Sequence, residues 1–237
     1  IPCRLARRVI ALSPSIFYQY LCRGWARPGA MRQISNLFSL DVRPTAAEID
    51  VIRERLLGSA ERGIQVVSVG RLEVGKRVDW LIQAWPRVIA ACPRARLWIV
   101  GDGPEAESLR QLAVDCGISA SCRFLGAQPR GIAYLAFADV VVMTTLYEAW
   151  GFVPVEAMAC GRPVVVTAAD GVRDQLTDGV EGCLVPPGDS DRLAEALIEL
   201  IRDPVLRERM GVAGRNRVAR LVASPVLDQY IELINEV

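Results

Sequence analysis

Two carboxylates, Glu148 and Glu156, flank a short stretch whose residue types suit the binding of a phosphate. Between them lie Gly151, Phe152 and Val153, followed by Pro154. Proline is favoured in the first turn of a helix because its missing N–H is not needed there, so Pro154 predicts that a helix begins here. The backbone N–H groups of the turn can then bind an anion, which the positive end of the helix dipole also attracts.

The positions of the two carboxylates indicate what surrounds this phosphate. Glu148 is predicted on the loop just before the turn, and Glu156 about one turn inside the helix. Carboxylates in these positions flank the anion and accept hydrogen bonds from hydroxyl groups. The stretch therefore predicts a nucleotide-sugar site, with ribose on one side of the phosphate and hexose on the other.

Six short apolar segments alternate with helical segments and must position this stretch. They are nearly continuous runs of branched residues, as strands buried on both faces are. The sequence therefore predicts an α/β fold, with a Rossmann-like parallel sheet and helices on both of its faces. Ligands of such sheets bind at the carboxyl ends of the strands, so the loops after the strands carry the chemistry. The predicted strands cover residues 64–69, 96–100, 121–125, 139–143, 163–167 and 182–185.

Residues 1–60 are interpreted as a short N-terminal remnant, the end of an N-terminal domain with its linker, because the chain begins with Ile1 and not with Met. Residues 61–220 form the predicted nucleotide-sugar-binding domain, and residues 221–237 a C-terminal crossover helix. Helices are expected to start at Ser13-Pro14 and at the capping box formed by Thr45 and Glu48. The basic, aromatic surface of residues 7–25 would suit peripheral contact with an anionic membrane, although an ordinary amphipathic helix has the same pattern.

Composition excludes several classes of protein. The 28 Lys and Arg residues nearly balance the 27 Asp and Glu residues, which argues against a nucleic-acid partner. The chain has no histidine, which excludes His-dependent hydrolases and His-ligated metal sites from these residues. Seven scattered cysteines without a C-x-x-C pair are interpreted as small core residues in a reducing compartment. No stretch reaches the roughly 18 apolar residues of a membrane span, so a cytoplasmic location is expected, with at most peripheral contact at the inner face of the membrane.

The segment 146–166 resembles the E-x7-E signature of the retaining glycosyltransferases with the GT-B fold, often called family 4 or group 1. Residues 70–76 are similar to the family's G-R-L-x-x-x-K segment, residues 101–104 to its G-D-G-P segment, and residues 184–189 match it well. Residues 170–174, D-G-V-R-D, differ from the commoner G-G-x-P-E. The resemblance implies the C-terminal, donor-binding domain of such an enzyme.

The resemblance assigns Arg71 and Lys76 to the diphosphate of the donor. The planar fork of Arg grips two phosphate oxygens and Lys adds a mobile charge, which suits a leaving group whose charge grows as the glycosyl bond breaks. The resemblance also assigns Glu156 to ribose hydroxyls and Glu148 to hydroxyls of the donor sugar. The expected catalytic residues are therefore Arg71, Lys76 and Glu148. The other expected substrate contacts are Gly70, Gly101, Gly103, Ala127, Gln128, Gly151, Phe152, Val153 and Glu156.

Residues 101–106 also match the G-x-G-x-x-A pattern of dinucleotide-binding folds, but a tight turn lining the pocket is favoured over an NAD site. Asp102 and Glu105 stand where a pyrophosphate would approach, and no acidic residue follows the next strand, near Leu125, to hold a ribose. In the resembled family, the position of Ala127 and Gln128 cradles the base.

The expected activity is transfer of a hexose from a UDP- or GDP-linked donor to a glycan or lipid-linked acceptor, without a metal ion or other cofactor. An acceptor-binding N-terminal domain is the expected partner, and the chain alone is expected to bind nucleotide without turnover. Two alternatives stay open: a nucleotide-sugar epimerase of the same fold, and a non-catalytic donor-binding subunit. The sequence does not specify the hexose, the nucleobase or the acceptor.

Overall fold

The structure is a computed structural model that describes residues 6–40, 43–58, 63–222 and 225–236. Its centre is a six-stranded sheet in which every strand is parallel to its neighbours. The predicted parallel sheet is confirmed, and each strand lies within one residue of its expected ends. In spatial order the strands are β5 (Cys122–Phe124), β4 (Arg96–Val100), β3 (Gln65–Val69), β6 (Val140–Met143), β7 (Val164–Thr167) and β8 (Gly182–Val185).

Both faces of the sheet are buried, and successive strand residues point to opposite faces. In β6, Val140 and Val142 belong to one hydrophobic core, whereas Val141 belongs to the other. In β7, Val165 belongs to the first core and Val164 to the second. None of these five side chains is exposed to solvent. Burial on both faces is the reason that the strands are continuous apolar runs in the sequence.

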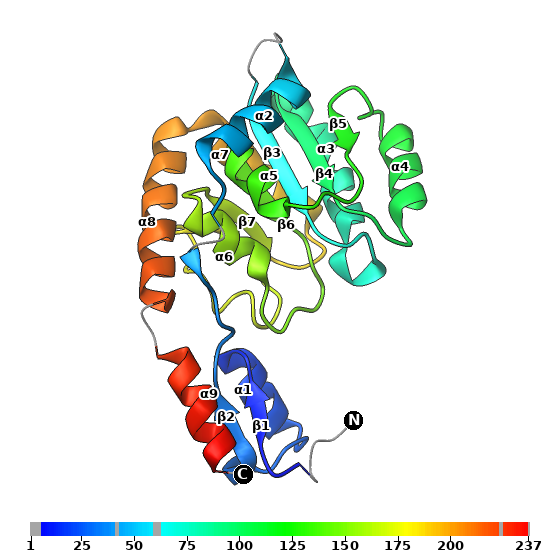
Figure 1. Cartoon of the computed structure of the whole chain (residues 1–237). Helices are drawn as coiled ribbons and strands as arrows, with labels where there is room; N and C mark the ends of the chain where they lie inside the picture. Colours follow the sequence, from blue (N-terminus) through cyan, green and yellow to red (C-terminus); the bar gives the residue numbers. More distant parts are fainter. Residues whose placement is uncertain (1–5, 41–42, 59–62, 223–224, 237) are drawn as a thin grey trace.

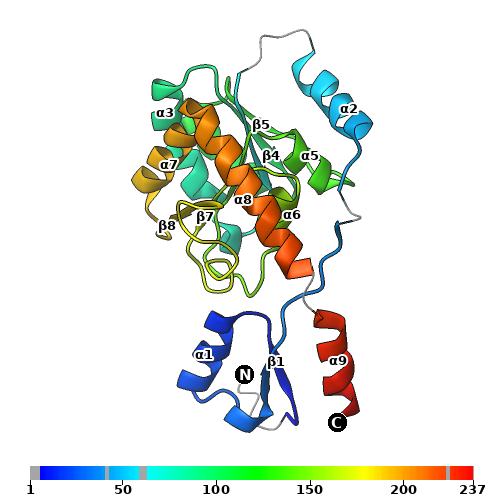
Figure 2. The ribbon, with the colours of Figure 1, turned by 90° about the vertical axis from the view of Figure 1, so that its left-hand side faces the viewer.

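Helices cover both faces of the sheet (Figure 1). The first core contains side chains of α3 (Val78–Ala91), α4 (Ala106–Asp115) and α7 (Ser190–Arg202). The second contains side chains of α2 (Ala46–Leu57), α5 (Gly131–Phe137) and α6 (Phe152–Ala159). The long helix α8 (Pro204–Val222) contributes Leu206 to the first core and Val218 to the second, so it spans both layers (Figure 2).

Residues 6–34 form a small separate body, called here the N-terminal unit (Figure 2). Its elements are β1 (Val9–Ala11), α1 (Pro14–Cys22), the 3₁₀ helix η1 (Pro28–Ala30) and β2 (Met31–Gln33), which pairs with β1 in parallel. The last helix, α9 (Val226–Asn235), packs on this unit because Val226 and Leu233 bury against Ile34. Arg8 also pairs with Glu236 at 3.2 Å. The first and last segments that the structure describes therefore lie side by side.

Both predicted helix starts are confirmed. The hydroxyl of Ser13 accepts a hydrogen bond from the Ile16 N–H at the start of α1, where Pro14 is the first helical residue. Thr45 and Glu48 form the expected capping box of α2. In the described part of the chain, no helix has both the length and the apolar character of a membrane span.

The order of the strands reverses between β3 and β6, and this reversal creates a crevice at their carboxyl ends. Residues 70–77 follow β3, and residues 144–151 follow β6. Hydrogen bonds join the two loops: Thr144 Oγ1 donates to the Lys76 carbonyl at 3.0 Å, and the Leu146 N–H donates to the Gly75 carbonyl at 2.9 Å. The fold thus brings the Arg71–Lys76 loop against the loop that carries Glu148.

Candidate active site

A cavity of about 370 Å³ lies at the carboxyl ends of β3 and β6. Apolar side chains such as Leu72, Met143 and Trp150 form part of its wall. Of the residues expected to bind or react, it brings together Gly70, Arg71, Lys76, Glu148, Gly151, Phe152 and Val153. The other expected residues, Gly101, Gly103, Ala127, Gln128 and Glu156, are not part of its lining.

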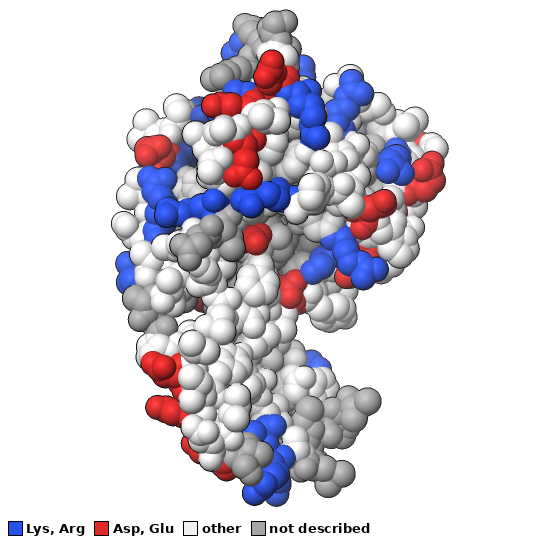
Figure 3. All heavy atoms as spheres, in the orientation of Figure 1, with Lys and Arg blue, Asp and Glu red and all other residues white. Residues whose placement is uncertain are grey.

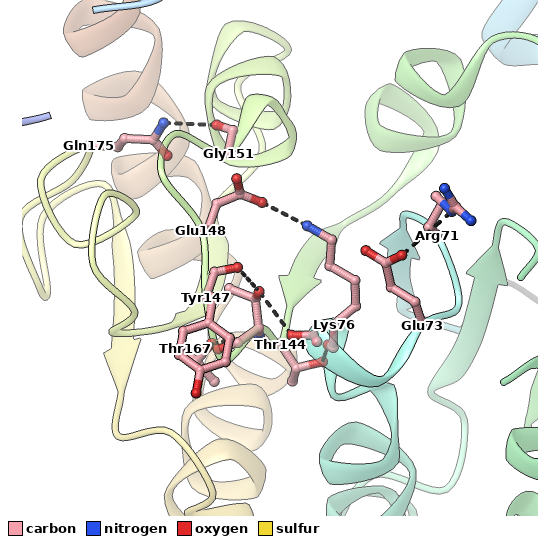
Figure 4. A network of polar contacts seen from close by, with 11 residues as sticks. Arg71, Glu73, Lys76, Thr144, Tyr147, Glu148, Gly151, Thr167 and Gln175 are labelled. Atoms are coloured by element: carbon pink, nitrogen blue, oxygen red, sulfur yellow. Dashed lines mark hydrogen bonds and ion pairs between the residues drawn. The ribbon is translucent and has the colours of Figure 1, made fainter. Parts of the chain in front are cut away.

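An ion pair in the cavity joins Lys76 and Glu148, which lie on different loops (Figure 4). Lys76 Nζ donates to Glu148 Oε2 at 2.7 Å, and the two side chains are 27% and 20% exposed. Lys76 is the only lysine of the chain, since every other one of the 28 basic side chains is arginine. An ammonium is a compact, mobile charge, whereas a guanidinium is a planar fork. The single lysine therefore stands where a mobile cation can exchange one anionic partner for another.

Arg71 lies at the mouth of the cavity and is largely exposed. Its Nε lies 3.6 Å from Glu73 Oε2, and its side chain is 72% exposed. Figure 4 shows it beside Glu73 and apart from the Lys76–Glu148 pair. Arg71 is thus free to turn toward an incoming anion, because a surface pair of this length holds it only weakly.

The turn that precedes α6 forms another wall of the cavity. Gly151 is the N-cap residue, with extended backbone angles, and Phe152 and Val153 are the first two helical residues. Pro154 is therefore the third helical residue, so the predicted turn belongs partly to the helix itself. The N–H groups of the first helical turn have no partners within the helix. Because no acidic side chain occupies this turn, these N–H groups and the helix dipole suit an anion such as a phosphate.

Glu156 lies one turn further along α6 and is half-buried. Burial raises the pKa of its carboxyl above the ordinary value. A half-buried carboxylate needs hydrogen-bond donors, and a ribose with two hydroxyls is a ligand that would supply them.

Gly101 and Gly103 lie where two loops approach each other too closely for a side chain. A Cβ at Gly101, whose φ is +141°, would lie 1.8 Å from the Gly70 carbonyl oxygen. A Cβ at Gly103 would lie 2.3 Å from the Leu72 carbonyl oxygen. Both glycines therefore allow the loop after β4 to pack behind the loop that carries Arg71.

Replacing Gly101 by alanine should destabilise the protein by about 2 to 3 kcal/mol, because the new Cβ forces the Gly70 backbone away. Urea unfolding followed by tryptophan fluorescence measures this change. Gly29→Ala serves as the control, since no atom lies within 4 Å of the added Cβ at that position. Equal stabilities of the two variants would contradict the close-packing role of Gly101.

The loop after β5 carries Ala127, which is exposed, and Gln128, whose side chain points away from the cavity. Gln128 Nε2 donates to the Leu125 carbonyl at 2.7 Å, and its Oε1 accepts from the Tyr134 hydroxyl at 2.8 Å. Arg55 of α2 reaches the same Tyr134 hydroxyl. These contacts give Gln128 a structural role in shaping its loop, so any contact of this loop with a base would come from other atoms.

The cysteines were expected to be small core residues, but not all of the described ones are buried. Cys122 is buried, whereas Cys22 is exposed at the end of α1, and none of the described cysteines forms a disulfide. Burial raises the pKa of the Cys122 thiol to about 12 and that of Cys160 to about 11. Both thiols thus stay protonated near neutral pH and do not act as nucleophiles.

One polar side chain at the site, Gln175, was not identified from the sequence. It lies between β7 and β8, and its Nε2 donates to the Gly151 carbonyl at 2.8 Å (Figure 4). The sequence signal was indirect: the segment just before it, residues 170–174, differs from the pattern of the resembled family.

Residues 53–217 match the family described as glycosyl transferases group 1. The chain belongs to this family, as the E-x7-E stretch and the loops after the strands predict, and its sheet is a Rossmann-like domain of the GT-B fold.

Several bacterial proteins that this chain resembles are named as glycosyltransferases. The chain is 33% identical over 227 residues to the lipopolysaccharide core biosynthesis glycosyltransferase LpsE of Rhizobium meliloti, covering 95% of this chain and 63% of that protein. It is 38% identical over 184 residues to a GDP-mannose-dependent monoacylated alpha-(1-6)-phosphatidylinositol monomannoside mannosyltransferase of Corynebacterium glutamicum, covering 74% and 48%. The structure of Anabaena HepE in complex with UDP and glucose has a TM-score of 0.89 at 27% identity, covering 99% and 65%. The chain thus spans about half to two thirds of the length of these proteins.

Proposed function

We propose that this chain is the donor-binding half of a retaining, metal-independent glycosyltransferase. It would take a hexose from a UDP- or GDP-linked donor and pass it to a glycan or lipid-linked acceptor. The observation that carries this proposal is the Lys76–Glu148 pair, which lines the same cavity as the N-terminal turn of α6. One cavity thus holds a mobile cation, a hydroxyl acceptor and a set of free N–H donors.

Each part of this arrangement has a role in breaking the glycosyl bond. The diphosphate of the donor would lie between Lys76, Arg71 and the N–H groups of the α6 turn, which stabilise the negative charge that grows as the bond breaks. Lys76 would then leave Glu148 for the diphosphate, and Glu148 would accept hydrogen bonds from hydroxyls of the hexose. This chain would contribute mainly positioning and charge stabilisation, because it contains no histidine that could act as a general base.

The relatives support a UDP- or GDP-linked donor and a lipid-linked acceptor. One is named for its dependence on GDP-mannose, and HepE was solved with UDP-glucose. The names of the relatives also refer to lipopolysaccharide core and to phosphatidylinositol mannosides.

Calorimetric titration of the chain with UDP, GDP and ADP tests the donor-binding role. We expect UDP or GDP to bind, and the corresponding nucleotide sugar to bind as well. Absence of binding by all of these ligands would contradict the proposal. Transfer itself is measured with the enzyme that joins this chain to an acceptor-binding half, and NMR of the products separates sugar transfer from epimerisation of the donor.

Replacing Glu156 by alanine should lower the affinity for both the free nucleotide and the nucleotide sugar by about tenfold. Each ligand loses the hydrogen bonds that its ribose hydroxyls would donate to a charged acceptor. Inorganic diphosphate has no ribose, so its affinity should stay the same. Calorimetry with both probes measures the difference. Equal losses for inorganic diphosphate and for the nucleotide would show that Glu156 does not contact the ribose.

A further inference from the structure

Gln175 occupies an unusual position for a polar side chain. It is fully buried in the segment between β7 and β8, and its Nε2 donates to the Gly151 carbonyl at 2.8 Å. Its Oε1 is buried and has no hydrogen-bond partner among the described residues. A buried amide with an unpaired oxygen destabilises the folded state relative to an apolar side chain of the same shape. This arrangement favours a positional role for Gln175 over a stabilising one.

The hydrogen bond of Gln175 helps to fix the orientation of the peptide that opens α6, since it adds a second donor to the N-cap carbonyl that accepts the first bond of the helix. The carbonyl of Gly151 and the N–H of Phe152 belong to one planar trans peptide, so they point in opposite directions. Because the carbonyl turns toward the buried Gln175, the N–H turns the other way. Both Gly151 and Phe152 line the cavity. Gln175 therefore helps to hold the first free N–H of α6 toward the place proposed for the phosphate.

The segment that carries Gln175 also packs against the loop that carries Glu148. Gly171 has a φ of +86°, and a Cβ there would lie 2.4 Å from the Glu148 carbonyl oxygen and 2.3 Å from that of Ala149. The backbone at Gly171 thus packs directly on the backbone that carries Glu148. Residues 170–175, called here the support loop, consequently contact the E-x7-E stretch at Glu148 and at Gly151.

The support loop is held from its other side by α1 of the N-terminal unit. Asp174 Oδ2 accepts a hydrogen bond from the Ser15 N–H at 2.8 Å, and the Gly171 N–H donates to Ser15 Oγ at 2.8 Å. Gln19 Nε2 donates to Asp170 Oδ2 at 2.8 Å. The carboxylate of Asp174 thus satisfies a free N–H at the N-terminus of α1, where the helix dipole also favours a negative charge. Hydrogen bonds to the carboxylates of Asp170 and Asp174 therefore join the N-terminal unit to the domain that contains the sheet.

We propose that Gln175 is a positioning residue for the phosphate-binding turn of α6, and that Asp174 makes its position depend on α1. Movement of the N-terminal unit would then change the geometry of the donor site through the support loop. This proposal rests on the proposed function only in naming the ligand, because the positioning of the turn is a property of the protein alone.

The test compares Gln175→Met with a matched control, Gln65→Met. Methionine keeps the length of the side chain and removes its amide donor. Gln65 is also a buried glutamine whose Nε2 donates to a carbonyl, that of Gly63, at 2.6 Å, but it begins β3 and is not part of the cavity lining. Hydrogen exchange of residues 148–156 reports the order of the turn, and calorimetry with UDP and GDP reports its effect on binding.

In Gln175→Met we expect faster exchange in residues 148–156 and an affinity for the bound nucleotide that is about fivefold lower, the effect of one misplaced hydrogen bond. Gln65→Met should change neither. Asp174→Ala should speed exchange in the same residues, because the loop loses the hydrogen bond nearest to Gln175 of those that join it to α1. Unchanged exchange or unchanged affinity in Gln175→Met would overturn its positioning role, and unchanged exchange in Asp174→Ala would overturn the dependence on α1. If the wild-type chain binds neither UDP nor GDP, the proposed donor is wrong, while the exchange measurement still decides whether Gln175 positions the turn.

Discussion

Replacing Glu148 by glutamine is expected to lower sugar transfer by about a hundredfold or more, because a group that stabilises the transition state in a buried site contributes on that scale. Glutamine has nearly the same shape but lacks the negative charge that, in the proposed function, would orient the hydroxyls of the hexose. Glu148 also forms an ion pair with Lys76, whose Nζ lies 2.7 Å from Glu148 Oε2. Its replacement frees the Lys76 ammonium for the diphosphate, so the affinity for free UDP or GDP should stay the same or rise.

Two measurements separate these effects. Calorimetry measures nucleotide affinity in the isolated chain, and release of the nucleoside diphosphate measures turnover in the enzyme that contains both halves. Glu107→Gln is the control, because it removes a carboxylate from an exposed pair with Arg110 on α4, outside the cavity. Full turnover by Glu148→Gln would show that this carboxylate does not act on the donor sugar.

Replacing Lys76 by alanine is expected to abolish transfer. It should also lower the affinity for nucleoside diphosphates by about tenfold to a hundredfold, the range for loss of a hydrogen bond to a charged group. The loss has two causes. The diphosphate loses a cation, and Glu148 is left in a partly buried site without its partner, where it repels the incoming anion. Arg71→Ala should have a smaller effect on affinity, because its side chain is largely exposed.

The chain allows an unusually direct test, since Lys76 is its only lysine. Reductive methylation with ¹³C-formaldehyde labels one side-chain amine in addition to the terminal amine, and NMR then follows the Lys76 signal. Addition of UDP or GDP should shift this signal. Lys76→Arg keeps the charge but loses the compact ammonium, so it should bind nucleotide better than Lys76→Ala while transferring poorly. A Lys76 signal that does not respond to a nucleotide that binds would remove Lys76 from the diphosphate site.

Parts of the fold and of the site were visible in the sequence because they depend on local preferences. Ser13 and Thr45 open helices through bonds to N–H groups three residues away. Gly151 and Pro154 mark the start of α6, because proline is favoured in the first turn of a helix. The loop glycines were identified as special, but their role differs: Gly101 and Gly103 allow close backbone packing and do not line the cavity.

Other parts could not be predicted because they depend on where a side chain turns after the elements have packed. Gln128 stands on a loop after a strand, as a ligand-binding residue does, but it turns toward Tyr134 and α2. Arg71 was predicted to bind the diphosphate and does line the cavity, but only the structure shows that its side chain is largely exposed.

By itself, the sequence determined the parallel sheet and the chemistry of the loops, because apolar runs report burial and residue types report what they can bind. Only the tertiary structure decided that Lys76 meets Glu148 across 72 residues of chain, and that Gln175 holds Gly151 across 24. Neither of these two contacts follows from the local preferences of the sequence. Each depends on the reversal of strand order between β3 and β6 and on the packing of the loops that follow the strands, which bring distant segments to one edge of the sheet.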